Sequence, residues 1–211
     1  MRNQPSPDRA VIGDRDALAW LAPDVLAPAR WLTATALTSS ELRSSAAAVY
    51  EGLLHEVAPG TWAPWDLLRT PRQRAESLAP LLPAQAVVIR ASAAWVHAGA
   101  IPPRQVTVAL PRGGGTPRRH VVTHVARLPP EATATIGGIA VTTPLRTACD
   151  LLRFAPEDVA FARLRALLRA GLPVDDVEVE VHRMGGLPGA RRAARLLASA
   201  EGQQVVARSG A

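Results

Sequence analysis

Apolar and polar positions in the segment 138–154 follow the period of a strand at first and that of a helix afterwards. β-branched residues alternate with other residues up to Thr143, which predicts a strand. After Pro144 the apolar residues recur every three to four positions, which predicts a helix with one buried face. Thr143 can cap this helix, and Pro144 suits its first turn, where a backbone N–H would have no partner. Arg146 and Asp150, four residues apart, can pair on it, so we expect a core joint here.

The segment before residue 70 predicts short helices followed by a two-stranded hairpin. Thr38 and Glu41 fit a capping box, which begins a helix. A second helix is expected over residues 45–51, with Gly52 ending it. Two short apolar runs flank the turn signal at residues 59–60, so a hairpin is expected there. This order is that of a winged helix-turn-helix, and the alternative is a small helical cap on the next domain. Two earlier short helices are expected, over residues 14–21 and 23–32.

Residues 71–144 alternate between strand and helix patterns, and the chain from Pro156 on reads as helical. In the middle segment, strands are expected over residues 86–89, 105–110 and 120–128, and helices over 71–82 and 91–98. Further helices are expected over residues 156–170, 174–184 and 189–197. The glycine-rich loop 111–117 is expected to be a hairpin tip, because a phosphate-binding loop would need a helix start after it.

These patterns predict an α+β fold with an N-terminal winged helix-turn-helix, a small mixed α/β domain and C-terminal helices. The expected divisions are a flexible tail (1–10), a winged-helix-like domain (11–70), an α+β domain with C-terminal helices (71–200) and a second flexible tail (201–211).

The basic residues are all arginine, which excludes several kinds of chemistry. The chain has 24 of them and a net charge of +6. Without lysine there can be no P-loop lysine, no Schiff-base lysine and no nuclease carboxylate–lysine motif. Cys149 is the sole cysteine, so an internal disulfide is impossible and a reducing cytoplasm is the default. No apolar run reaches the length of a membrane span, and no secretion signal begins the chain, so we expect a cytoplasmic protein with no membrane partner.

The excess positive charge is concentrated in the middle of the chain. Residues 71–144 hold eight arginines against two acidic residues, whereas residues 1–70 hold six against eight. The candidates for an anion-binding surface are Arg72, Arg74, Arg112, Arg118 and Arg119. A basic surface beside a winged helix suggests nucleic acid. A solvated arginine surface or an acidic protein partner would give the same pattern.

No set of residues stands out as a catalytic or metal site. His120 and His124 are four apart on an expected strand, about 13 Å at strand rise, which is too far for one metal. The acidic residues between Asp175 and Glu180 are expected to form a solvated helix face. Cys149 is expected to be a buried, inert thiol, and His97 a packing or hydrogen-bonding residue. We expect no metal, no cofactor and no enzyme activity.

Five segments resemble, in their order, the AbiEi-like antitoxins of actinobacterial type IV toxin–antitoxin systems. The similarity covers roughly residues 37–200. The most recognisable segment is GIAVTTPLRTACDLL, which is similar to the family's Val-Thr-(Ser/Thr)-Pro-x-Arg-Thr-x-x-Asp-Leu pattern. The other segments are LTSSELR followed by GLLHEVAPGTWAP, ASAAWVHAGA, QVTVALPRGG followed by HVVTHVARLPPE, and MGGLPGARRAARLL.

The resemblance implies a winged-helix DNA-binding region joined to an α/β domain. Members of the family are thought to repress their own operon and to counter a nucleotidyltransferase-like toxin. Many related chains continue into a nuclease-like domain. This chain stops at Ala211 and has no lysine for such a site, so we expect no nuclease activity.

The expected function is therefore a DNA-binding transcriptional regulator with a toxin protein as a possible partner. The expected DNA contacts are Arg43, Ser45, Tyr50 and His55, together with Arg72, Arg74, Arg112, Arg118 and Arg119. The expected recognition helix, SSAAAVYEG, lacks the arginine and asparagine side chains that usually read bases. One alternative is therefore a protein-interaction module that retains the fold. Another is an enzyme, which clustering of Asp150, Asp175 and Asp176 around a pocket would favour.

Overall fold

The computed structural model describes residues 32–33, 46–58, 61–64, 68–99, 102–111 and 120–207. Trp31–Ala211 constitute one compact unit. The helix expected over 14–21 and the capping box of Thr38 and Glu41 lie outside the described residues. The fold is α+β, with a mixed five-stranded sheet and several helices.

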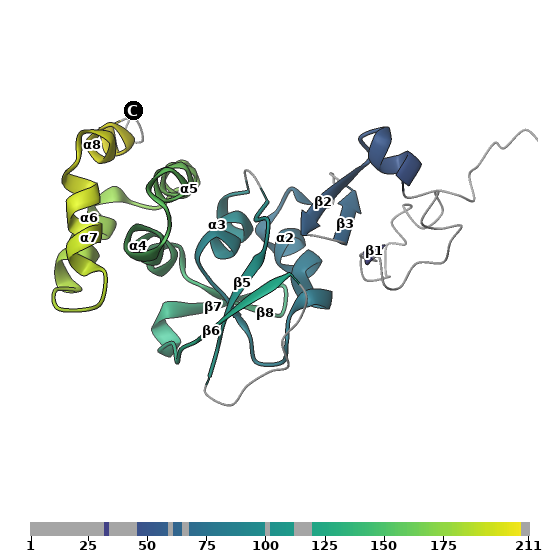
Figure 1. Cartoon of the computed structure of the whole chain (residues 1–211), viewed down its shortest axis with the longest axis horizontal. Helices are drawn as coiled ribbons and strands as arrows, with labels where there is room; N and C mark the ends of the chain where they lie inside the picture. The colour runs from purple at the N-terminus through teal and green to yellow at the C-terminus, as the bar shows by residue number, and fades with distance from the viewer. Residues whose placement is uncertain are drawn as a thin grey trace, which may run out of the picture. The chain divides into compact units, whose positions relative to one another are not determined.

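A small antiparallel sheet comes first along the chain (Figure 1). Its strands are β1 (Leu32–Thr33), β2 (Leu54–Ala58) and β3 (Thr61–Pro64), in the order β1-β3-β2. The β2–β3 hairpin confirms the sequence prediction. Leu32, expected to end a helix, instead pairs with Trp62 in β3. Residues 46–50 are helical, and Gly52 follows them at φ +74°, as expected of a glycine that ends a helix.

The five-stranded sheet contains β4 (Val87–Val88), β5 (Val106–Leu110), β6 (Val121–Val125), β7 (Thr133–Ile136) and β8 (Ile139–Thr142). Its order is β6-β5-β4-β8-β7. Strands β5 and β6 run parallel, with Val106 opposite Val121. Parallel neighbours need a crossover connection, so the loop that contains residues 113–115 is not the hairpin tip that the sequence predicted.

Strand β7 was not among the strands expected from the sequence. It pairs with β8 in an antiparallel hairpin whose two-residue turn is Gly137-Gly138. Both glycines have positive φ, +55° and +77°. Two consecutive residues with positive φ characterise the type I′ turn that two-residue hairpins favour. A glycine pair between two β-branched runs was therefore the signal for this hairpin.

The helices follow the sequence-predicted pattern, with one addition. They are α2 (Pro71–Leu78), α3 (Arg90–Ala98), α4 (Pro144–Phe154), α5 (Glu157–Arg169), α6 (Val174–Arg183), α7 (Ala190–Ala198) and α8 (Ala200–Ala207). Helix α8 lies where a flexible tail was expected, and Val205 within it is 1% exposed. Val205 packs in the hydrophobic core of the C-terminal helices.

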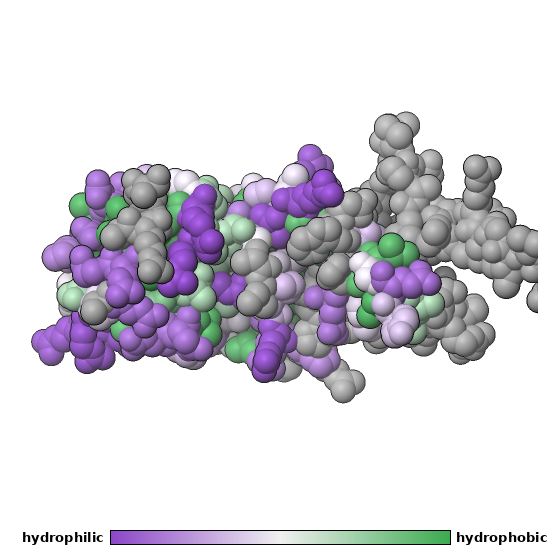
Figure 2. Space-filling model, turned by 90° about the horizontal axis from the view of Figure 1, so that it is seen from above, coloured by the Kyte–Doolittle hydropathy of each residue, from purple (hydrophilic) through white to green (hydrophobic). Residues whose placement is uncertain are grey.

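Helix α3 lies between two hydrophobic cores (Figure 1). Its Trp95 and Val96 pack with α2 and the five-stranded sheet. Ala94 packs instead with α4 and the C-terminal helices. Polar residues dominate the outer face of those C-terminal helices, on the left in Figure 2. Because most side chains of α3 are small, residues of both cores can pack close to this helix.

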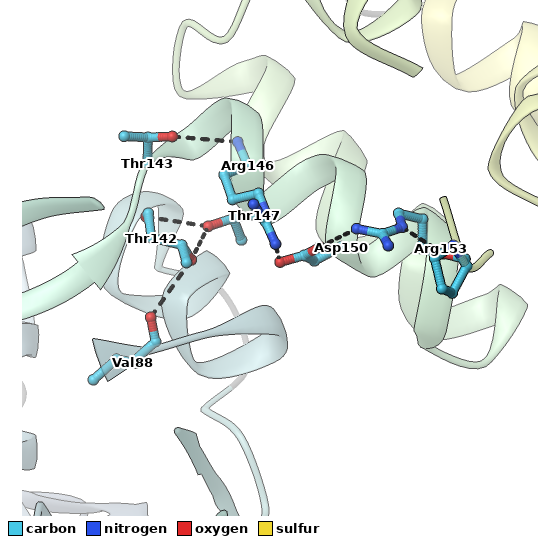
Figure 3. A network of polar contacts seen from close by, with 8 residues as sticks. Val88, Thr142, Thr143, Arg146, Thr147, Asp150 and Arg153 are labelled. Atoms are coloured by element: carbon cyan, nitrogen blue, oxygen red, sulfur yellow. Dashed lines mark hydrogen bonds and ion pairs between the residues drawn. The ribbon is translucent and has the colours of Figure 1, made fainter. Parts of the chain in front are cut away.

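The strand-to-helix joint forms as expected between β8 and α4. Thr143 caps α4 by accepting a hydrogen bond from the Arg146 N–H at 3.3 Å, and Pro144 occupies the first turn. Two buried hydroxyl groups fix the joint to the sheet (Figure 3). Thr142 Oγ1 lies 2.7 Å from Thr147 Oγ1 and donates to the Val88 carbonyl of β4 at 3.4 Å. The joint therefore fixes the start of α4 and the side chains that α4 presents.

Candidate nucleic-acid interface

Two of the sequence-predicted DNA contacts, Tyr50 and His55, lie in the helical residues 46–50 and the β2–β3 hairpin. Ala48 and Leu54 are buried beneath them, at 4% and 2% exposed. Tyr50 is 93% exposed and so presents its whole ring and hydroxyl to solvent. His55 lies in β2, opposite Ala63. Arg43 and Ser45 lie outside the described residues.

The structure separates the two arginines of α2 that the sequence assigned to one surface. The Arg72 side chain is 78% exposed and forms an ion pair with Glu76 at 2.8 Å. Arg74, only 6% exposed, points into the interior. The remaining predicted members of the surface, Arg112, Arg118 and Arg119, lie outside the described residues.

Arg74 uses its whole guanidinium inside the fold. Its Nε and Nη2 donate to the carbonyls of Val96 and His97 at the end of α3, at 3.0 and 3.1 Å. Its Nη1 donates to the carbonyls of Leu68 and Arg69, at 2.9 and 2.8 Å. Burial lowers the pKa of Arg74 from its ordinary value. Arg74 therefore ties the chain after the hairpin to α3, and it is not available for a surface contact.

A second group of arginines surrounds Asp150 on α4 (Figure 3). Arg146 Nε lies 2.8 Å from Asp150 Oδ2, and Arg153 Nη1 lies 3.0 Å from Asp150 Oδ1. Arg153 also donates through Nε to the Pro188 carbonyl at 2.8 Å. The Asp150 carboxylate is thus shared by two guanidinium groups from its own helix, three and four residues away.

Arg90, from the start of α3, joins this group through an aromatic ring. The guanidinium carbons of Arg90 and Arg153 lie 4.8 and 4.5 Å from the centroid of the Phe154 ring, both in cation–π contact. Arg90 Nη1 is also 3.1 Å from His124 Nε2 on β6. We call Arg90, Arg146, Asp150, Arg153 and Phe154 the arginine cluster.

The surroundings of His124, which contacts Arg90 of the arginine cluster, favour the neutral form of its ring. Its pKa is lowered by burial first and by the charge of Arg90 second. A neutral His124 accepts the Arg90 hydrogen bond at Nε2 and carries its proton on Nδ1. Burial also lowers the pKa of Arg90; the charge of Asp150 opposes this effect, and that of Arg153 adds to it.

A mostly apolar hollow of about 330 Å³ lies beside the start of α4. It is lined by His97, the α4 residues Thr143, Pro144 and Leu145, and residues at the end of α5. His97 Nε2 lies 2.6 Å from the Thr142 carbonyl, the hydrogen-bonding role that the sequence predicted for His97. Burial lowers the pKa of His97, so the neutral ring donates through Nε2.

The acidic residues named for the enzyme alternative have different surroundings. Asp150 is held between Arg146 and Arg153, whereas Asp175 and Asp176 are exposed in the first turn of α6. Within the described ranges, no three His, Cys, Asp or Glu side chains lie close enough to hold a metal ion. Cys149 is fully buried, as expected, and burial raises the pKa of its thiol to about 12.

Sequence reasoning missed the arginine cluster except for the Arg146–Asp150 pair. That pair was visible because a spacing of four brings side chains together on any helix. The contacts of Arg90 with His124 and Phe154 join residues 34 and 64 positions apart, and no local pattern signals them.

Comparison with known proteins adds a distant structural likeness. No family model matches the chain, and no curated protein matches it. The crystal structure of RV2827C protein from Mycobacterium tuberculosis is similar over 91% of this chain and 80% of that one, at 21% sequence identity and a TM-score of 0.40. We draw nothing about function from a likeness at this level.

None of the helices in the described part of the chain combines the length and hydropathy needed to cross a bilayer.

Proposed function

We propose that this chain is an antitoxin-like transcriptional regulator that binds DNA through its N-terminal region. The observation that carries the proposal is the order β1-β3-β2 of the small sheet. A winged helix places a short strand ahead of its recognition helix and pairs it with the second strand of the wing hairpin. Here β1 precedes the helical residues 46–50 and pairs with β3, the second strand of the hairpin.

In this proposal the helix 46–50 enters the major groove, as the second helix of a helix-turn-helix does. Tyr50 is the base-reading side chain, because it projects fully from that helix. Arg43, Ser45, His55, Arg72, Arg112, Arg118 and Arg119 remain the proposed backbone contacts. Arg74 is removed from the set because its guanidinium is bound to four backbone carbonyls.

The resemblance to AbiEi-like antitoxins extends the proposal to a partner and an operon. The chain would repress its own operon and counter a nucleotidyltransferase-like toxin. Co-expression of the protein with a neighbouring gene product of that class, followed by affinity capture, tests the partner. The toxin is expected to be retained with the tagged protein. Recovery of the tagged protein without the toxin would contradict the proposal.

A binding titration tests the DNA proposal. The protein is titrated with the DNA upstream of its own gene and with a scrambled duplex, at about 50 and 200 mM salt. Phosphate contacts weaken steeply as salt rises, whereas base contacts carry the preference for one sequence. We expect a preference for the upstream duplex that persists at the higher salt. Equal binding of both duplexes, lost with salt, would indicate only a basic surface.

A second candidate is a protein-interaction module, favoured by the surface around Tyr50. Val49, Tyr50 and Leu53 are exposed together, at 41%, 93% and 44%. Glu51 and Glu56 are exposed beside them. Apolar side chains next to acidic ones suit a protein partner better than a phosphate backbone. Absence of DNA binding at both salt concentrations would favour this candidate.

A further inference from the structure

We propose that Arg90 and Arg153 bind a phosphate group beside Phe154, at a site separate from the N-terminal DNA-binding region. The site is built by α3, α4 and β6, and none of its residues is among the proposed DNA contacts. It therefore does not depend on the winged-helix proposal, and either can fail alone.

The first argument is the charge balance of the arginine cluster. Arg90, Arg146 and Arg153 supply three positive charges, and Asp150 supplies the sole negative charge within the cluster. Placing guanidinium groups together in a partly buried site is costly unless an anion offsets them. Arg90 and Arg153 lie against the same ring, and the charge of Arg153 contributes to lowering the pKa of Arg90 after burial does. A bound dianion would compensate this excess.

The second argument is the hydrogen-bonding capacity that remains. Arg90 engages Nη1 with His124, and its Nε and Nη2 have no partner among the described residues. Arg153 engages Nε and Nη1, and within the same residues its Nη2 has no partner. Among the described residues, the buried side-chain nitrogens without a partner belong to Arg163 and Arg165, not to this cluster. The remaining donors of Arg90 and Arg153 therefore reach solvent, where an anion can meet them.

The third argument is that the cluster is held in place before any ligand arrives. Arg90 has φ +52°, a left-handed conformation that is costly for a residue with a side chain. His124 fixes one end of its guanidinium, and the Phe154 ring supports its face. Arg153 is fixed by Asp150 and by the Pro188 carbonyl. Ordered donors lose little entropy on binding.

The chemistry of the donors favours phosphate over a carboxylate. A carboxylate has two acceptor oxygens and one negative charge, and Asp150 already supplies one carboxylate to Arg153. A phosphate has more acceptor oxygens and a larger charge, which suits two guanidinium groups held against one aromatic ring. Phe154 is 42% exposed, so the position lies at the surface and is open to a small phosphate or to a phosphate in a polymer.

Calorimetric titration of the full chain with inorganic phosphate, at constant ionic strength, tests the proposal. We expect saturable binding of one phosphate per chain. Arg90→Gln should weaken it at least tenfold, since it removes a charge and both remaining donors. Arg183→Gln is the matched control, because it removes the same charge from a side chain that is 78% exposed and lies on α6. It should bind as the wild type does.

Phe154→Leu provides a second variant should Arg90→Gln not fold, as circular dichroism would show. It removes the shared ring without removing a charge, and we expect weakening of several-fold. Failure of the wild type to bind phosphate saturably, or equal weakening in Arg183→Gln, would overturn the proposal. Competition by a duplex of random sequence would identify a backbone phosphate as the ligand. If the duplex does not compete, the ligand is a small free phosphate.

Discussion

Asp150 Oδ1 lies 3.0 Å from Arg153 Nη1, and both side chains are only 7% exposed. Removing one partner of a buried ion pair leaves the other charge uncompensated. Asp150→Asn should therefore lower the free energy of unfolding by about 3 kcal/mol, measured by urea denaturation. Glu76→Gln breaks the exposed pair with Arg72 and should cost at most about 0.5 kcal/mol. Equal effects of the two substitutions would contradict a buried, structural role for Asp150.

Arg74 should behave as an interior residue although it carries a charge. Arg74→Met removes donors to four backbone carbonyls and should cost about 2–4 kcal/mol of unfolding free energy. Arg72→Met, at an exposed position of the same helix, should lower the unfolding free energy far less. Thermal or urea unfolding of the two variants makes the comparison. A small effect at position 74 would mean that its guanidinium is not bound as described.

The two glycines of the β7–β8 turn should differ in their tolerance of alanine. A Cβ at Gly137 would lie 2.8 Å from Glu76 Cγ and 3.1 Å from the Arg72 carbonyl oxygen. A Cβ at Gly138 would meet nothing within 4 Å. Both positions have positive φ, so Gly138→Ala should cost about 1 kcal/mol and Gly137→Ala clearly more. Equal melting temperatures for the two variants would be inconsistent with the packing of this turn on α2.

His97 should make stability depend on pH. Burial lowers its pKa below the ordinary value of 6.5, so the unfolded chain binds more protons than the folded chain in this range. Its stabilising contribution is complete above about pH 6.5 and is lost as the pH falls toward its folded-state pKa. The unfolding free energy should therefore decrease from pH 7 to 5.5.

His97→Gln should reduce that decrease, whereas His182→Gln, which replaces an exposed histidine of α6, should leave it intact. Urea unfolding at several pH values between 5.5 and 7 supplies the comparison. His124 also has a lowered pKa, so part of the slope should remain in His97→Gln. An unchanged slope in His97→Gln would show that this ring is not buried as a neutral donor.

Sequence reasoning succeeded where the determining interactions are local. The cap of α4 by Thr143 and the Arg146–Asp150 pair each involve residues three or four apart, and both formed as predicted. The β2–β3 hairpin was likewise visible from its turn signal and flanking apolar runs. Each of these features is fixed by spacing along the chain alone.

The errors at Arg74, at the β5–β6 pairing and at Arg90 concern interactions between distant residues. Nothing around Arg74 in the sequence shows that the end of α3, over twenty residues on, offers carbonyls to its guanidinium. The parallel pairing of β5 with β6 depends on the whole sheet, and the loop between them resembles a hairpin tip in isolation. The joining of Arg90 to His124 likewise needs the folded arrangement of α3 beside β6.

The central claim, that the helix 46–50 and the hairpin read DNA, is tested most directly through Tyr50. This side chain is 93% exposed, so Tyr50→Ala should leave folding unchanged. The measurement is the ratio of dissociation constants for the upstream and scrambled duplexes, in the wild type and in Tyr50→Ala, at about 200 mM salt. We predict a wild-type preference for the upstream duplex that falls about tenfold in Tyr50→Ala, because base contacts supply specificity. A wild type without preference, or a ratio unchanged by the substitution, would contradict the claim.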